Sequence, residues 1–351
     1  MNVTQLEAWL GFTQEAPLDP DLPICDPHHH IWDYPDSLPE NQVRKSARLI
    51  RHYLLKQLLA DIDSGHNIIK TVFIQCGSMY KNDGPEELRP IGETGFVQGI
   101  TAQGATGRYG NIAAAAGIIG FADLLLGAAV ERVLAAHVAA GKDRFRGVRF
   151  STTWDANNGI GSNADTPDLL SDTRFREGFA KLQKYNLTFD AWVYFHQLPD
   201  LIALARAFPN TTVILDHIGT PLGIGPYSGK HSEVFQQWKK GIAELATCPN
   251  VTIKLGGLGM PLCGFGWAER ATPANSIELA KGMAPYFLWC IEQFGVDRCM
   301  FESNFPVDKS ACSYTVLWNA FKRIAADFSR DEKASLFHDT AVRIYRLSGK
   351  H

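Results

Sequence analysis

Short apolar runs rich in β-branched residues alternate along this chain with longer segments whose apolar positions recur every three or four residues. The first pattern is typical of buried strands and the second of amphipathic helices. Together they predict strands at residues 23–28, 68–75, 112–120, 145–150, 187–195, 212–215, 251–255 and 299–302. Between them, helices are predicted at residues 124–140, 172–184, 198–207, 233–246 and 277–294.

The spacing of these elements predicts the fold class. Every gap between consecutive predicted strands is long enough for the crossover that parallel strands require. The 351 residues therefore favour an α/β fold, a single distorted (β/α)8 TIM barrel with long loops at residues 77–111 and 256–274. A doubly wound sheet is the alternative, but no G-x-G-x-x-G follows a predicted strand. We assign residues 1–21 to an N-terminal extension and residues 22–351 to the barrel domain.

Composition and charge narrow the partners and the location. The 34 basic and 37 acidic residues give a net charge of -3, so no positive excess favours nucleic acid. The apolar stretch 112–130 contains glycines and Asp123, and we interpret it as a buried strand and helix, not as a membrane span. Seven cysteines without a C-x-x-C pair, and an N-terminus without signal-peptide features, indicate a cytoplasmic protein. A homo-oligomer is left open.

Three consecutive histidines end the first predicted strand. Because strand side chains alternate, we expect Ile24, Asp26, His28 and His30 to share the face toward the barrel mouth. Two imidazoles one strand step apart can bind one metal ion, and a hydrogen-bonded polar cluster is the alternative. The opposite face is expected to carry Cys25, Pro27 and His29.

Two more histidines fall at predicted strand ends. His196 ends the fifth strand, on the face that also carries Trp192 and Tyr194, and His217 ends the sixth. The eighth strand would bring residues 303–304 to the same rim. The carboxyl ends of barrel strands form one edge, so four histidines there favour a shared metal site over isolated core residues.

Several short motifs follow one another in an order that resembles a known family. They are D-x-H-x-H with the following I-W-D, RFRGVR around Gly147, YFHQL, DHIG, KLGGLG, SNFP and the closing LFHDTAVRIYRL. Over residues 22–348 this series is similar to the amidohydrolase-related branch of the amidohydrolase superfamily. The resemblance implies a distorted (β/α)8 barrel with one divalent metal ion at the strand ends.

The resemblance also implies roles for the histidines. It assigns His28, His30 and His196 as metal ligands and His217 as the proton-transfer residue beside the metal. Zinc is the expected ion and Mn²⁺ an alternative, and since some lactonases of this branch act without metal, a metal-free site is left open.

At the end of the eighth strand the chain departs from the family pattern G-S-D-F-P. Glu302 replaces the glycine and Asn304 replaces the aspartate. An amide cannot act as a base near neutral pH, so Asn304 is expected as a weak neutral ligand. Proton transfer would fall to His217, helped by Asp216 or Glu302. Neutral ligands would leave the ion's charge less compensated, which favours a small anionic substrate.

Arg149 is the candidate for binding that anion, because a guanidinium can bond both oxygens of a carboxylate. Strand alternation directs Arg149 into the barrel mouth and Arg146 outside it. Further candidates for lining the substrate site are Gln75, Trp154, Asp155, Trp192, Tyr194 and Lys254.

These residues predict a metal-assisted hydrolase that opens a small carboxylated lactone, or a related ring ester or amide. Water would be activated by the metal and His217. The I-W-D that follows the first motif is similar to that of sugar-lactone and muconolactone-type hydrolases. Two alternatives remain: a non-oxidative decarboxylase of an aromatic or unsaturated acid, and a non-catalytic binding protein on a decayed barrel.

Overall fold

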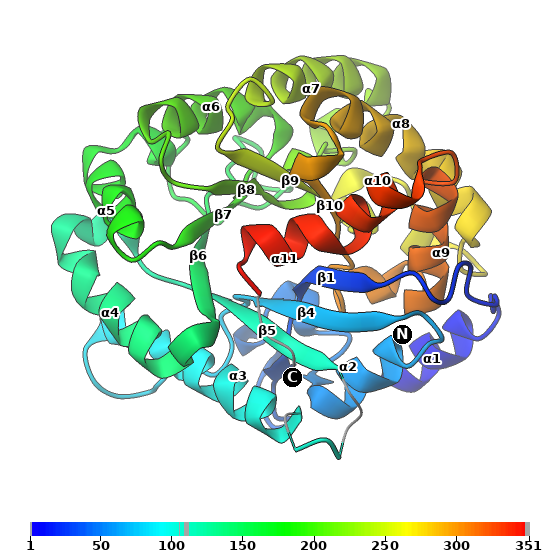
Figure 1. Cartoon of the computed structure of the whole chain (residues 1–351), viewed down its shortest axis with the longest axis horizontal. Helices are drawn as coiled ribbons and strands as arrows, with labels where there is room; N and C mark the ends of the chain where they lie inside the picture. The colour runs from blue at the N-terminus through cyan, green and yellow to red at the C-terminus, as the bar shows by residue number, and fades with distance from the viewer. Residues whose placement is uncertain (1, 105, 109–111, 348–351) are drawn as a thin grey trace.

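The eight predicted strands form one parallel sheet, in the order β1-β4-β5-β6-β7-β8-β9-β10. The computed structural model describes residues 2–104, 106–108 and 112–347. The strands surround a common axis and the helices α3 to α8 lie outside them (Figure 1), so the predicted (β/α)8 barrel is confirmed. The strands are β1 Ile24–His29, β4 Ile68–Ile74, β5 Ala113–Gly120, β6 Phe145–Ser151, β7 Thr188–Trp192, β8 Val213–Leu215, β9 Val251–Leu255 and β10 Cys299–Phe301.

The helices begin where the sequence supplies caps. Asn275 accepts hydrogen bonds from the amides of Ile277 and Glu278, and Asp172 accepts those of Arg174 and Phe175. The α-helices are α1 Val3–Leu10, α2 Leu55–Ile62, α3 Ile91–Gly104, α4 Val130–Gly141, α5 Thr173–Lys184, α6 Leu198–Ala207, α7 His231–Leu245, α8 Ser276–Phe294, α9 Tyr314–Ile324, α10 Arg330–Ala334 and α11 Thr340–Ile344.

Two sequence expectations about elements are corrected. The segment 77–111 contains the crossover helix α3, so it is not one long loop. The predicted fifth strand is shorter than expected, because β7 ends at Trp192 and residues Phe195–Gln197 form the 3-10 helix η7. A small antiparallel hairpin, β2 Trp32–Asp33 with β3 His52–Tyr53, follows the histidine run.

Apolar side chains fill the interior of the barrel at the end where the strands begin. Apolar side chains from five strands pack there with the C-terminal segment that includes α11. Lys70, near the start of β4, donates to the carbonyl of Leu347 at 2.7 Å. In Figure 1, α11 lies across the middle of the barrel. This apolar cluster consists of Cys25, Val72, Ile74, Ile119, Ile214, Met300, Ala341, Tyr345 and Leu347.

A charged layer is buried next to that cluster. The Lys254 ammonium, on β9, lies 2.7 Å from Asp190 Oδ2 and 2.9 Å from Asp216 Oδ1, and all three side chains are fully buried. The Tyr345 hydroxyl donates to Asp190 at 2.6 Å. Buried charges are tolerated only when paired and hydrogen-bonded, and these groups satisfy one another. This charged layer lies inside the barrel, below the carboxyl ends of the strands.

The alternation expected for β1 is interrupted by an irregular register. Asp26 pairs with Thr71 and His29 with Phe73, so β1 carries one residue more than β4 over this step. Cys25 belongs to the interior cluster, whereas the Asp26 carboxylate accepts from the Tyr314 hydroxyl of α9. The expected shared face of Asp26 and His28 is wrong, because the extra residue changes the phase between them.

The N-terminal extension packs onto the barrel beside α8 and α9. Trp9 donates to the carbonyl of Arg270 at 3.0 Å, and Glu15 accepts from the Ser276 amide at 2.7 Å. Asn319 of α9 donates to Glu15 and accepts from the Leu18 amide. The extension thus makes specific polar contacts with the barrel shell.

The apolar stretch at residues 112–130 is divided between β5, the 3-10 helix η4 and the start of α4, as the sequence predicts. Residues Leu124–Arg144 are long and apolar enough to cross a membrane by length and composition alone, a test that core helices also pass. All seven cysteines are free and buried.

A buried histidine on α4 makes the stability of the barrel depend on pH. His137 bonds to Thr94 and to the carbonyl of Phe121, each at 2.8 Å, and burial lowers its pKa from 6.5 to about 4. The unfolded chain binds this proton more readily, so the stabilisation is full above pH 6.5 and is lost as the pH falls toward 4. The free energy of unfolding should therefore fall between pH 7 and pH 4.5 in the parent protein. We expect this fall to be about 2–3 kcal/mol smaller in His137→Gln, as measured by urea titrations at the two pH values. Equal losses in the two proteins would contradict this.

Candidate active site

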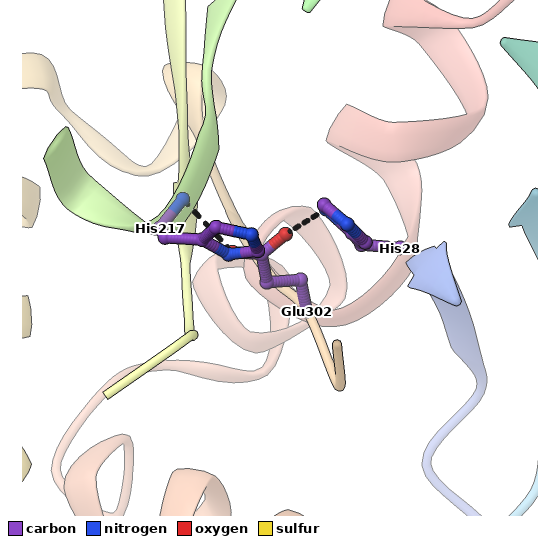
Figure 2. Close-up of side chains that lie close together, drawn as sticks. All are labelled: His28, His217 and Glu302. Carbon is purple, nitrogen blue, oxygen red and sulfur yellow. Dashed lines mark hydrogen bonds and ion pairs between the residues drawn. The ribbon is translucent and has the colours of Figure 1, made fainter. Parts of the chain in front are cut away.

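Three buried side chains meet where β1, β8 and β10 end: His28, His217 and Glu302 (Figure 2). One donor atom from each lies within 4.8 Å of the other two. His28 belongs to β1, His217 to the turn after β8, and Glu302 directly follows β10. The carboxyl ends of parallel barrel strands bring these positions together although they are far apart in the sequence.

The Glu302 carboxylate lies between the two imidazoles (Figure 2). Its Oε1 is 2.6 Å from His217 Nδ1 and also accepts the His217 amide at 3.0 Å. Its Oε2 is 2.6 Å from His28 Nδ1. A carboxylate can only accept, so this contact favours the His217 tautomer with a proton on Nδ1 and a bare Nε2. The bare nitrogen is the atom that can take up a proton.

A glycine loop after β9 leaves the space that this cluster needs. A Cβ on Gly257 would lie 2.5 Å from the His217 ring, and one on Gly256 would contact Glu302. Gly257 has φ +73° and His217 itself has φ 53°, both in the left-handed region. The motif KLGGLG thus carries the glycines that let two backbone segments approach the site closely.

The surroundings keep the first-strand histidines neutral. Burial, and then the charge of Lys254, lowers the pKa of His28 well below its usual value. Burial, and then the charge of Arg149, does the same for the pKa of His30. His30 Nδ1 bonds to the carbonyl of Ile74 at 2.8 Å, and its ring centroid lies 5.0 Å from that of His28. Neutral imidazole is the form that binds metal ions.

The donor set fits the divalent metal ion that the family resemblance implies. Imidazole nitrogens with one carboxylate are ligands that zinc accepts. Within the described part of the chain, buried Asp216 Oδ2 has no hydrogen-bond partner, and Glu302 Oε2 has only its 2.6 Å contact with His28 Nδ1, which lacks hydrogen-bond geometry. A carboxylate oxygen left without a partner is costly, and a bound cation would satisfy it. Because Glu302 is a carboxylate, this donor set is not made of neutral ligands only. The anionic substrate was expected because neutral ligands would leave the charge of the ion less compensated, and that reason does not apply to this donor set.

Three of the expected substrate-binding residues lie together beside the cluster. Arg149 is buried and points inward, as strand alternation predicts, with Nη1 3.4 Å from His28 Nε2. Its Nε donates to the side chain of Gln75 at 3.3 Å and its Nη2 donates to the Gln75 carbonyl. The Arg149 Cζ atom lies over the Trp192 ring, 5.9 Å from the ring centroid. The centroid of the Trp192 ring is 5.8 Å from that of the His217 ring. These contacts occupy most of the Arg149 donors.

The structure does not bring His196 into this cluster. Because β7 ends at Trp192, His196 lies in η7, where its Nε2 bonds to the carbonyl of Trp154 at 2.9 Å and lies 3.8 Å from Asp155. Its Nδ1 is buried without a hydrogen-bond partner among the described residues. Tyr194 is also separate, since its hydroxyl donates to the carbonyl of Gly161. The strand-end geometry expected for His196 is therefore wrong.

The Asn304 side chain makes its hydrogen bond outside the His28–His217–Glu302 cluster. Its φ is 54°, and its Nδ2 donates to Asp308 Oδ1 at 2.8 Å. The expected neutral ligand at residue 304 is thus engaged elsewhere, while the carboxylate at residue 302 faces the histidines. Burial raises the pKa of Asp308 to about 7.

Sequence reasoning missed Asp190, Tyr345 and Asp308. Asp190 had a visible signal, since it is the only charge in the apolar run around β7 and strand alternation directs it inward. Asp308 had no signal of that kind, because its role depends on a turn that brings it back to Asn304. The same is true of Tyr345, which reaches Asp190 from the C-terminal segment across 155 positions.

Fold and site together define the class: a (β/α)8 barrel whose carboxyl-end rim carries a buried histidine–carboxylate site. A sequence model of the Amidohydrolase family matches residues 25–347, and the chain belongs to that family. It is 33% identical over 335 residues to the uncharacterised protein y4mH of Sinorhizobium fredii, covering 93% of this chain and 99% of that protein.

Two further relatives come from Burkholderia multivorans. An L-fucono-1,5-lactonase is 30% identical over 187 residues, which cover 52% of this chain and 60% of the lactonase. A crystal structure of an amidohydrolase with bound zinc superposes with a TM-score of 0.71 at 24% identity, covering 93% of this chain and 99% of that chain. At that identity the structural likeness shows the fold.

The positions of Glu302 and His196 predict different effects on metal content. Glu302→Gln removes the charge between His28 and His217, and we expect the affinity for Zn²⁺ to fall about 10- to 100-fold. His196→Gln should bind Zn²⁺ like the parent protein, because His196 lies outside the cluster. Equilibrium dialysis with metal analysis measures both. The reverse order, with His196→Gln losing the ion, would favour the ligand set implied by the family resemblance.

Proposed function

We propose that this protein is a metal-assisted lactonase that opens the ring ester of a small hydroxyl-bearing lactone. The observation that carries the proposal is the Glu302 carboxylate held against His217 Nδ1, which leaves Nε2 as a buried base. The partial identity to L-fucono-1,5-lactonase supports a lactone as the substrate. The barrel mouth is where hydrolases of this fold bind their substrates.

Proton movement in the proposed reaction centres on His217. Its Nε2 takes a proton from the attacking water as the water oxygen bonds to the lactone carbonyl carbon. Glu302 Oε1, 2.6 Å from Nδ1, stabilises the imidazolium that forms. When the ring C–O bond breaks, the same Nε2 returns the proton to the leaving oxygen, and a hydroxy acid results.

His28 and Glu302 Oε2, with His30 beside them, are the residues we assign to a bound metal ion. Such an ion supplies Lewis-acid polarisation of the carbonyl and a lower pKa of water. Burial, and then the charge of Lys254, lowers the pKa of His28 and keeps the imidazole neutral, which this role requires. Zinc is the ion we propose, since imidazole with carboxylate suits it.

A neutral, hydroxyl-bearing substrate is preferred here to a carboxylated one. The Arg149 guanidinium donates through Nε and Nη2 to Gln75, while Nη1 faces His28 and Asp216. A guanidinium with these partners has few donors left for the two oxygens of a substrate carboxylate. Trp192, beside His217, supplies an apolar wall for the ring.

The proposal predicts that His217→Ala lowers kcat about 10²- to 10⁴-fold, the usual contribution of a general base. The assay is acid release from L-fucono-1,5-lactone, from other aldonolactones and from a carboxylated lactone, followed with a pH indicator. His52→Ala, on the exposed hairpin strand β3, is the control and should keep full activity.

Three outcomes would count against this proposal. Near-normal turnover by His217→Ala would remove the base. Release of carbon dioxide from an aromatic acid, without activity on any lactone, would favour the decarboxylase. Preference for the carboxylated lactone would restore the anionic substrate.

A further inference from the structure

Asp308 is a buried carboxylate to which the lactonase proposal gives no role. It lies in the segment between β10 and α9 and is 1% exposed. Oδ1 accepts from Asn304 Nδ2 at 2.8 Å, and Oδ2 accepts from the Gly259 amide at 3.1 Å. Its own amide donates to the Asn304 carbonyl at 3.1 Å. One side chain thus joins the turn after β10 to the glycine loop after β9.

The glycine loop carries this connection to the site. A Cβ on Gly259 would lie 2.7 Å from Asp308 Oδ2, and one on Gly257 would lie 2.5 Å from the His217 ring. A Cβ on Gly256 would contact Glu302. The residues 256–259 therefore contact Asp308 at one end and the histidine–carboxylate cluster at the other.

Asp308 also decides the orientation of Asn304. A carboxylate can only accept, so it binds the Nδ2 end of the amide and turns Oδ1 the other way. The described residues donate no hydrogen bond to Oδ1, so it remains a free acceptor on a residue two positions after Glu302. A hydroxyl group is the kind of substrate donor that such an oxygen recognises.

We propose that Asp308 is a positioning residue of the active site: it orients the Asn304 amide toward a substrate hydroxyl and holds the glycine loop that seats His217. The recognition of a substrate hydroxyl by Asn304 rests on the lactonase proposal. The structural half of the inference, that Asp308 holds the glycine loop and so positions His217, does not depend on it. It assigns a function to the replacement of aspartate by asparagine at residue 304, since a carboxylate there would face the carboxylate of Asp308.

The pair can be exchanged without losing its hydrogen bonds. Asp308→Asn alone offers one acceptor oxygen to two donors, Asn304 Nδ2 and the Gly259 amide. Asn304→Asp alone places two carboxylates 2.8 Å apart where one amide hydrogen bond was. In the double exchange N304D/D308N, the amide now at position 308 donates to the carboxylate now at position 304 and still accepts from Gly259, so both contacts return.

The first readout is kinetic and uses the best lactone of the panel at pH 8, where the Asp308 carboxyl, whose pKa is about 7, is ionised. We expect each single variant to lower kcat/KM about 10- to 100-fold, the usual effect of a hydrogen bond to a charged group. The double exchange should recover to within about 10-fold of the parent protein. Asn319→Asp, a buried amide facing Glu15 in the N-terminal extension, is the control for general destabilisation and should keep its kcat.

The second readout needs no substrate. Nuclear magnetic resonance of protein labelled with ¹⁵N-histidine reports the tautomer and surroundings of the His217 ring. We expect its signals to shift in Asp308→Asn and to return in the double exchange, with no shift in Asn319→Asp. If no lactone is turned over, the lactonase proposal fails, and these spectra still decide the structural half of the inference.

Two results would overturn the inference. One is an unshifted His217 signal in a folded Asp308→Asn protein, because the loop would then not depend on Asp308. The other is a double exchange that regains the melting temperature of the parent protein but stays as impaired in kcat/KM and in the His217 spectrum as the single variants. Asp308 would then stabilise the fold without positioning the site.

Discussion

The site depends on how the barrel closes between its first and last strands. β1 and the segment that follows β10 are joined by the bridge between His29 and Phe305, in which the His30 amide donates to the Phe305 carbonyl at 2.8 Å. Asn304 in turn donates through its amide to the His28 carbonyl at 2.9 Å. Asp26 strengthens this seam by accepting the amide and hydroxyl of Ser303. Closure at this seam brings Glu302 to His28, so the fold and the site form together.

Burial of charge explains why the cluster has its particular composition. Lys254 needs the carboxylates of Asp190 and Asp216, because an unpaired ammonium inside a barrel is very costly. The positive charges of Lys254 and Arg149 in turn disfavour protonation of His28. Glu302 adds a carboxylate whose two oxygens lie 2.6 Å from His28 Nδ1 and from His217 Nδ1. Ionic packing and proposed chemistry therefore use the same groups.

Most of the architecture could be predicted, and about half of the site. The apolar runs placed all eight strands within a few residues, because burial on both faces leaves a strong local signal. Arg149 was directed inward correctly by alternation, whereas the extra residue in β1 separated His28 from the face predicted for Asp26. His196 was misplaced because nothing in its local sequence shows that β7 ends at Trp192. Asn304 was expected at the cluster because a turn geometry with φ 54° cannot be derived from residue type alone.

The sequence by itself determined the parallel barrel, the rim on which polar strand ends gather, and the substitution of glutamate and asparagine in the last motif. These follow from periodicity and residue identity, which are local properties. Only the tertiary structure decided that Glu302 faces both histidines and that Asn304 turns to Asp308. Those outcomes depend on one extra residue in β1, on left-handed turns and on glycines that permit close approach. Such features act between segments far apart in the chain, where sequence patterns carry no direct signal.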